Sequence, residues 1–160
     1  MIRAANPKDS KEIVEIYNHY VETSIVTFET ELVSGDEMGD RIRALAQTHP
    51  WVVYEQDGQI QGYAYASPWK NRNAYKHSVE VSVYVRPGSQ GHGIGSMLMR
   101  ELLDRIEEID VHCLIAGVAL PNAGSVALHE KFGFNNIGQF KEVGRKFNKW
   151  VDVGYWQLII

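Results

Sequence analysis

The chain has 160 residues, 44% hydrophobic and 22% charged, which is typical of a soluble globular protein of one domain, residues 1–160. The formal net charge of −4 argues against a nucleic-acid or anionic-membrane partner, because either would require a basic face. A single cysteine, Cys113, excludes an intrachain disulfide, and the histidines lack paired ligand spacing, so we expect no metal. No signal peptide or membrane-spanning apolar run is evident, so a cytoplasmic location is the default expectation.

The first fifty residues predict a short strand at 2–5 followed by two helices, with an irregular segment at 24–33 between them. Two capping-box patterns mark the helix starts, Asp9 with Glu12 and Ser34 with Glu37.

The central part of the chain predicts strands at 51–56 and 60–66, joined by the hairpin dipeptide Asp57-Gly58. A further strand is expected at 78–85, and a glycine-rich loop follows it. The helix after the loop should bury one face, made by Ile94, Met97, Leu98, Leu102 and Ile106.

The C-terminal part predicts a strand at 111–120, so apolar that we expect both its faces to be covered. A helix should begin at Pro121-Asn122 and end at Gly133, and two strands should follow, at 134–143 and 150–160. Together these elements predict an α/β (α+β) fold with six or seven strands and about four helices on both sides of the sheet.

The loop Gln90-Gly91-His92-Gly93-Ile94-Gly95 joins a β-branched strand to a helix, an order that presents free backbone N–H groups to an anion. A P-loop would need a lysine that is missing here. A Rossmann fingerprint would need glycine in place of Ser96 and an acidic residue after the next strand. The pattern Gln/Arg-x-x-Gly-x-Gly/Ala fits, although a plain glycine turn is the simpler alternative for these six residues alone.

With this loop the chain resembles the GNAT superfamily of acetyl-CoA-dependent N-acetyltransferases. Asn122, Ser125 and the segment 128–134 resemble the family's second cofactor motif, one strand downstream. The resemblance implies a mixed, mostly antiparallel sheet. It also implies that the sheet splays between the strand of Glu80 and the strand 111–120 to admit acetyl-CoA.

A closer resemblance, spanning nearly the whole chain, is to the phosphinothricin and methionine sulfoximine (or sulfone) N-acetyltransferases. Its most specific part is the loop Pro68-Trp69-Lys70-Asn71-Arg72-Asn73-Ala74-Tyr75. The resemblance implies acetyl transfer to the α-amino group of a small amino acid. It also implies a homodimer in which loops of the second subunit complete the site.

The resemblance also implies the cofactor contacts. Backbone groups of Val83 and Val85 would pair with the pantetheine arm, and the loop amides would hold the pyrophosphate. The predicted acetyl-CoA contacts are Val83, Tyr84, Val85, Gln90, Gly91, His92, Gly93, Ile94, Gly95, Ser96, Asn122 and Ser125. On sequence grounds alone, Asn122 is equally well read as a helix N-cap.

Two residues are predicted to be catalytic. Glu80 is the candidate base, since an α-ammonium must lose a proton before it attacks a thioester and burial would raise this carboxyl's pKa towards the working pH. A solvent-facing strand glutamate is the alternative. His129 stands where many GNAT enzymes place a tyrosine acid, so it is expected to contact the cofactor or to protonate the leaving thiolate.

The predicted substrate contacts lie in three segments. Arg72 is the expected clamp for an anionic group, because a guanidinium matches carboxylate and phosphinate oxygens, with Lys70 as a helper. Both could instead be solvated loop cations. The full set is Phe28, Glu31, Trp69, Lys70, Arg72, Asn73, Tyr75 and Ser82.

Two other functions stay open on the sequence. One is acetylation of a different amine, such as a protein N-terminus or an aminoglycoside. The other is a non-catalytic acetyl-CoA-binding module, which would be indifferent to the loss of the Glu80 carboxylate.

Overall fold

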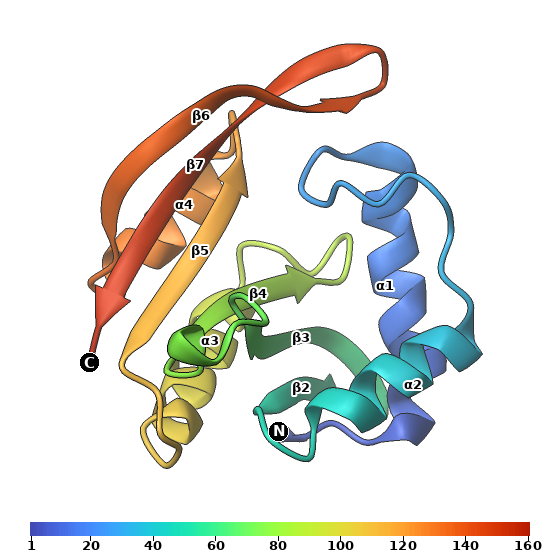
Figure 1. Ribbon diagram of the computed structural model, residues 1–160. Helices are drawn as coiled ribbons and strands as arrows, with labels where there is room; N and C mark the ends of the chain where they lie inside the picture. The colour runs from blue at the N-terminus through green and yellow to red at the C-terminus, as the bar shows by residue number, and fades with distance from the viewer.

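A computed structural model describes residues 1–160, and one sheet of seven strands organises it (Figure 1). The strand order across the sheet is β1-β2-β3-β4-β5-β7-β6, and every neighbouring pair is antiparallel except β4 and β5. The strands are β1 Ile2–Ala4, β2 Trp51–Gln56, β3 Gln59–Pro68, β4 Ser78–Val85, β5 Cys113–Ala119, β6 Asn135–Lys146 and β7 Lys149–Ile159. This is the mixed, mostly antiparallel sheet that the family resemblance implies.

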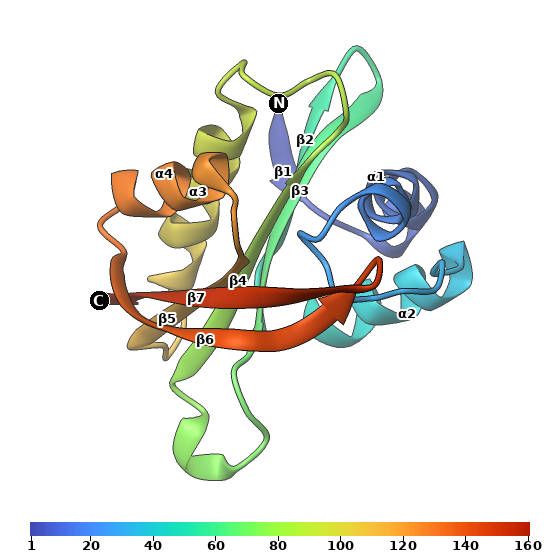
Figure 2. The ribbon, with the colours of Figure 1, turned by 90° about the horizontal axis from the view of Figure 1, so that it is seen from above.

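Four α-helices cover the two faces of the sheet (Figure 2). One face carries α1 (Ser10–Thr23) and α2 (Gly35–Leu45), and the other carries α3 (Ile94–Ile106) and α4 (Ala123–Lys131). Short 3₁₀ turns lie at Pro7–Asp9 and Asn73–Tyr75. Each helix pair has its own buried apolar cluster, so the sheet separates two cores.

The hairpins follow from local turn chemistry. Asp57 and Gly58 both have positive φ angles, 53° and 75°, as a two-residue turn requires, so the predicted hairpin is confirmed. Phe147 and Asn148 form the corresponding turn between β6 and β7, with φ angles of 52° and 59°. Strand β6 is longer than predicted and continues to Lys146, whereas β7 has the predicted length and is shifted by one residue towards the N-terminus.

The parallel pair β4–β5 is short. Its register covers only Ser78–Glu80 on β4 and Cys113–Ile115 on β5, whereas β4 pairs with β3 over its length from Val79 to Val85. From Val81 onward one edge of β4 therefore has no neighbouring strand. The splay predicted between these two strands is confirmed, and it begins at Glu80.

Two local predictions are wrong. Asp9 makes no side-chain cap to α1, and the capping box lies in the preceding 3₁₀ turn, between Asn6 and Asp9. The Glu12 carboxylate instead accepts a hydrogen bond from the backbone N–H of Ile60 at 2.8 Å. Tertiary contact with β3 has thus recruited the side chain that the local pattern assigns to the cap.

The buried face of α3 is also rotated from the predicted one. Met99 is fully buried in the core of this face, while Met97 is exposed. Ile94, Leu98, Leu102 and Ile106 are buried as predicted. Methionine fits either position by its hydrophobicity, so the pattern alone could not choose between the two.

None of the helices is both long and apolar enough to cross a membrane.

The two methionines of α3 give a test of this packing. Met99→Ala should lower the free energy of unfolding by about 2–5 kcal/mol, because it opens a cavity in a fully buried site. Met97→Ala, at a side chain that is 38% exposed, should cost less than about 1 kcal/mol. Urea unfolding of both variants measures the difference, and equal losses would contradict the face assigned to α3.

Candidate active site

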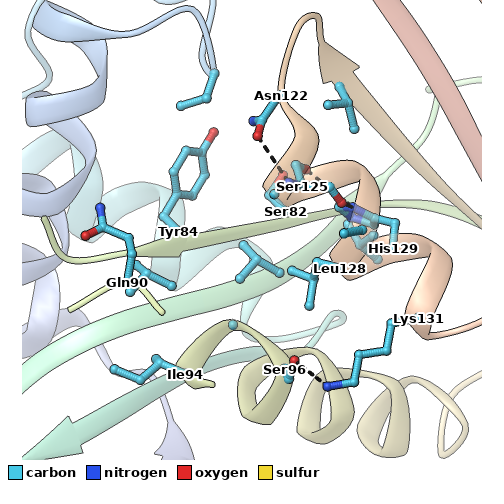
Figure 3. A pocket seen from close by; sticks show the side chains of 18 of the residues that line it. Ser82, Tyr84, Gln90, Ile94, Ser96, Asn122, Ser125, Leu128, His129 and Lys131 are labelled. Atoms are coloured by element: carbon cyan, nitrogen blue, oxygen red, sulfur yellow. Dashed lines mark hydrogen bonds between the residues drawn. The ribbon is translucent and has the colours of Figure 1, made fainter. Parts of the chain in front are cut away.

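A cavity of about 590 Å³ lies where β4 and β5 diverge (Figure 3). Its walls are the free part of β4, the glycine loop, the end of β5 and helix α4. Every predicted acetyl-CoA contact lines it except His92, whose exposed side chain lies outside. Ser82 and His129 line it as well. The fold thus gathers the two motifs of the sequence, separated by a strand, around one cavity.

The glycine loop leaves the start of α3 open to an anion. Gly91 and Gly93 have φ angles of 80° and 77°, in the left-handed region that favours glycine. Gly93 is the N-cap of α3, and no side chain caps that end. The first N–H groups of α3 are therefore free, and the helix dipole adds positive potential there.

A cation reinforces this end of the cavity. The Lys131 ammonium, which also lines the cavity, donates a hydrogen bond to the Ser96 hydroxyl at 3.0 Å (Figure 3). The first turn of α3 contains no acidic residue. Free amides, dipole and ammonium together suit a phosphate-bearing ligand.

The free edge of β4 forms the floor of the cavity. Val83 and Val85, the predicted main-chain partners of an extended ligand, lie on the part of β4 that pairs only with β3. The Val85 carbonyl already accepts a hydrogen bond from the Tyr20 hydroxyl. The same hydroxyl accepts one from the Gln90 side chain at 3.1 Å, which ties the glycine loop to α1.

Glu80 lies at the point where the two strands part, and it is the last residue of β4 that pairs with β5. Its side chain is half-buried, and desolvation raises its carboxyl pKa above the ordinary 4.5. Its Oε1 atom lies 3.8 Å from the place that a Cβ on Gly117 would occupy. Glu80 is not itself among the residues that line the cavity, but its neighbours Val81, Ser82 and Gly117 are, so this partly buried carboxylate lies beside the cavity.

His129 is buried in the last turn of α4, with 5% of its surface exposed. Its Nδ1 lies 2.7 Å from the Ser125 carbonyl oxygen, which can only accept, so Nδ1 carries the proton. The Nε2 atom is then an acceptor, and it is buried without a partner. Desolvation lowers the pKa of the ring below 6.5, so the imidazole is neutral at neutral pH.

The structure is compatible with both predicted roles of Asn122, the helix N-cap and the cofactor contact. Its Oδ1 accepts a hydrogen bond from the Ser125 N–H at 3.1 Å, so it is the N-cap of α4. It also lines the cavity, and its amide N–H groups stay available to a ligand.

Most of the predicted substrate contacts do not reach this cavity. The loop from Pro68 to His77 projects from the end of the sheet (Figure 2). Trp69 of this loop packs edge-to-face on Tyr155, with 5.8 Å between the ring centroids, and the Glu80 carboxylate helps to raise the pKa of Tyr155. The loop residues outside the cavity are Trp69, Lys70, Arg72, Asn73 and Tyr75.

Phe28 and Glu31 also lie outside the cavity. The Phe28 ring packs against Gly144 of β6, and the Glu31 side chain is exposed. The ordered carboxylate of this segment is Glu29, which Arg41 holds with two hydrogen bonds of 2.5 and 2.9 Å.

Sequence reasoning missed several residues that line the cavity. Tyr20 fits the apolar face of α1, and nothing local links it to a loop 70 residues away. Lys131 falls within the second motif, so its charge was a usable signal. The other unpredicted lining residues include Val26, Ser89, Gly117 and Leu128.

Comparison with known proteins identifies the family. The acetyltransferase (GNAT) domain family matches residues 2–154. The chain belongs to that family.

Individual relatives agree over nearly the full chain. Phosphinothricin N-acetyltransferase of Streptomyces viridochromogenes is 42% identical over 98% of this chain and 85% of its own length. The L-methionine sulfoximine/L-methionine sulfone acetyltransferase of Salmonella typhimurium is 35% identical, over 98% of this chain and 92% of its own length. The predicted resemblance is thereby confirmed, and the chain is an N-acetyltransferase.

Solved structures confirm the fold. A phosphinothricin acetyltransferase from Sinorhizobium meliloti in complex with acetyl-CoA superposes with a TM-score of 0.96, at 34% identity over 100% of this chain and 88% of that one. A ribosomal-protein-alanine N-acetyltransferase from Brucella melitensis superposes with a TM-score of 0.97, at 37% identity over 100% and 99% of the two chains.

The protonation state of His129 is open to measurement. An NMR titration of its ring should give a pKa below 6.5, because burial disfavours the charged form. The unfolded chain then binds this proton more readily than the folded one, so His129 should destabilise the fold as the pH falls through 6.5. His129→Asn should therefore lose less stability between about pH 7.5 and about pH 5.5 than the parent protein. A ring that titrates at or above 6.5 would contradict this assignment.

Proposed function

We propose that this enzyme transfers the acetyl group of acetyl-CoA to the α-amino group of a small, anionic amino acid of the phosphinothricin or methionine sulfone type. One observation carries the proposal. The uncapped start of α3 and the free edge of β4 line a single cavity, and Glu80 lies beside it, where β4 and β5 part. The names of the relatives support the substrate class.

Different residues would bind the phosphates of acetyl-CoA at one end of the cavity and position its reacting carbonyl at the other. The amides from Gln90 to Ser96 and the Lys131 ammonium would hold the phosphates of acetyl-CoA, which supplies the acetyl group as a thioester. The free edge of β4 would align its extended arm. The phosphates and the reacting carbonyl would then lie at opposite ends of β4, with the carbonyl towards Glu80.

Glu80 would take one proton from the acceptor ammonium, directly or through a water. An α-amino group titrates near pH 8, so a carboxylate with a moderately raised pKa is an adequate base. The freed amine would attack the thioester carbonyl, so that the C–N bond forms and the C–S bond breaks, and the second proton that the nitrogen loses would pass to the departed thiolate, directly or through water. The leaving thiolate has a conjugate thiol pKa near 8.5 and can depart without an acid.

For His129 we favour contact with the co-substrate over the acid role. Its one proton is committed to the Ser125 carbonyl, and a second proton would have to enter a buried site. The unpartnered Nε2 is instead ready to accept a hydrogen bond from a donor of the bound ligand.

The anionic end of the acceptor would be bound by Arg72 and Lys70 of a second subunit. In one chain these cations lie on a projecting loop outside the cavity, which leaves the acceptor side open. The edge strand β6 exposes an apolar surface suited to a partner copy, and its members are Ile137, Phe140, Val143 and, from β7, Trp150. We therefore propose a homodimer with shared sites.

Two other classes of acceptor amine are alternatives, and one of them has a specific observation in its favour. The Brucella neighbour is named as an acetyltransferase of a ribosomal protein, so a protein N-terminus is the second candidate acceptor. An aminoglycoside has no such support. A cytoplasmic location and the absence of metal, nucleic-acid and membrane partners stay predictions from the sequence.

The role of Glu80 can be tested by an isosteric change. Glu80→Gln should lower kcat/KM for the acceptor by about 10²–10⁴-fold, the usual contribution of a general base, and leave acetyl-CoA binding by calorimetry unchanged. The exposed Glu108→Gln is the matched control. The parent enzyme should also lose activity as the pH falls through a value above 4.5, because Glu80 becomes protonated there.

The acceptors to compare are phosphinothricin, methionine sulfone, a ribosomal-protein N-terminal peptide and an aminoglycoside. Turnover on the peptide alone would move the substrate to the second candidate. A protein that binds acetyl-CoA but turns over none of them would be a binding module.

The shared site predicts complementation between two defective variants. Arg72→Ala and Glu80→Gln should each be nearly inactive at low acceptor concentration. After subunit exchange in an equal mixture, about a quarter of the sites would combine an intact Glu80 with an intact Arg72 from the partner, so about a quarter of the parent activity should return. No recovery, with exchange verified by native mass spectrometry, would place Arg72 and Glu80 of one chain in the same site.

A further inference from the structure

A buried lysine links the end of the β6–β7 hairpin to the connection between α1 and α2. Lys146 is the last residue of β6, and only 4% of its surface is exposed. Its ammonium donates hydrogen bonds to the carbonyl oxygens of Ser24 at 2.6 Å, Thr27 at 2.8 Å and Tyr20 at 3.4 Å. The three N–H donors of the lysine thus have three backbone acceptors.

The backbone of the segment that Lys146 contacts has few other hydrogen bonds to the rest of the chain. Residues 24–29, called here the 24–29 segment, contain no helix or strand. Local hydrogen bonds join Val26 to Ser24 at 3.2 Å and Glu29 to Thr27 at 3.3 Å. Figure 1 shows the tip of the β6–β7 hairpin reaching towards this segment at the end of α1. The charge-assisted bonds from the Lys146 ammonium therefore restrain a backbone that has only weak local hydrogen bonds of its own.

A second contact joins the same two parts of the chain. Gly144 and Lys146 lie two residues apart on one face of β6, and both are buried, whereas Arg145 between them is exposed. The Phe28 ring lies so close to Gly144 that a Cβ there would overlap it. The absence of a side chain at position 144 therefore leaves the space that the Phe28 ring occupies.

The 24–29 segment also takes part in the site. Val26 lines the cavity, so the position of this backbone sets part of the cavity wall. The Thr27 hydroxyl lies 2.8 Å from the Tyr17 hydroxyl, and Glu29 pairs with Arg41 of α2. Nothing in the acetyl-transfer chemistry uses Lys146 itself.

We propose that Lys146, near the C-terminus, is a positioning residue. It holds the 24–29 segment in place along the acceptor side of the cavity. The place of the acceptor rests on the proposed function, whereas the restraint on the segment does not. Since acetyl-CoA would be gripped mainly by the glycine loop, loss of this restraint should affect the acceptor more than the co-substrate.

The experiment removes the ammonium and keeps the apolar stem, in Lys146→Met. Amide hydrogen exchange of the unliganded protein, followed by mass spectrometry, should be about tenfold faster over residues 24–31. The KM for the acceptor should rise about tenfold, while the KM for acetyl-CoA stays within about twofold. Lys141→Met, at an exposed lysine of the same strand, is the control and should change neither.

Unchanged exchange over residues 24–31 in Lys146→Met, or an equal rise of both KM values, would overturn the proposal. If Lys146→Met fails to fold by circular dichroism, Gly144→Ala decides instead, because it displaces Phe28 and leaves the lysine in place. It should raise the acceptor KM selectively, and an unchanged acceptor KM would count against the proposal. A parent protein that acetylates no amine would refute the proposed function, and the exchange result would still decide the role of Lys146.

Discussion

The structure depends on one interrupted interaction, the parallel pairing of β4 with β5. This pairing joins Ser78–Glu80 to Cys113–Ile115 and then stops. A continuous pair would fill the space that the cavity occupies and would satisfy the backbone edge that an extended ligand could use. Because β4 stays paired with β3 to its last residue, the opening removes the hydrogen bonds of only one edge of β4. The position of Glu80 at the divergence follows directly.

The electrostatic potential differs between the two ends of the cavity. At one end lie the free amides of α3 and the Lys131 ammonium, and beyond the other lies the Glu80 carboxyl, whose pKa desolvation raises. A ligand with anionic phosphates at one end and a neutral thioester at the other has one favourable orientation in such a field. Burial matters equally for His129, where the Ser125 carbonyl fixes the tautomer and leaves one acceptor without a partner.

The sequence predicts the parts of this site that depend on local patterns. The bounds of β4, the hairpin at Asp57-Gly58 and the glycine loop depend on alternation, turn chemistry and positive φ angles, all of which a short window of sequence carries. Contacts between distant segments carry no such signal. Lys146 lies 119 residues from Thr27, and its charge alone would place it in solvent. The choice between Met97 and Met99, and the recruitment of Glu12 by Ile60, likewise depend on the assembled core.

The division of the core has a consequence for how such an enzyme can diversify. The cluster under α3 and α4 supports the proposed acetyl-CoA half of the site, and the cluster under α1 and α2 supports the half that we propose faces the acceptor. A sheet lies between them, so side chains of one cluster can be repacked without a change in the volume of the other. New acceptor specificities can therefore arise by remodelling one layer, while the machinery that grips the acyl donor is inherited intact.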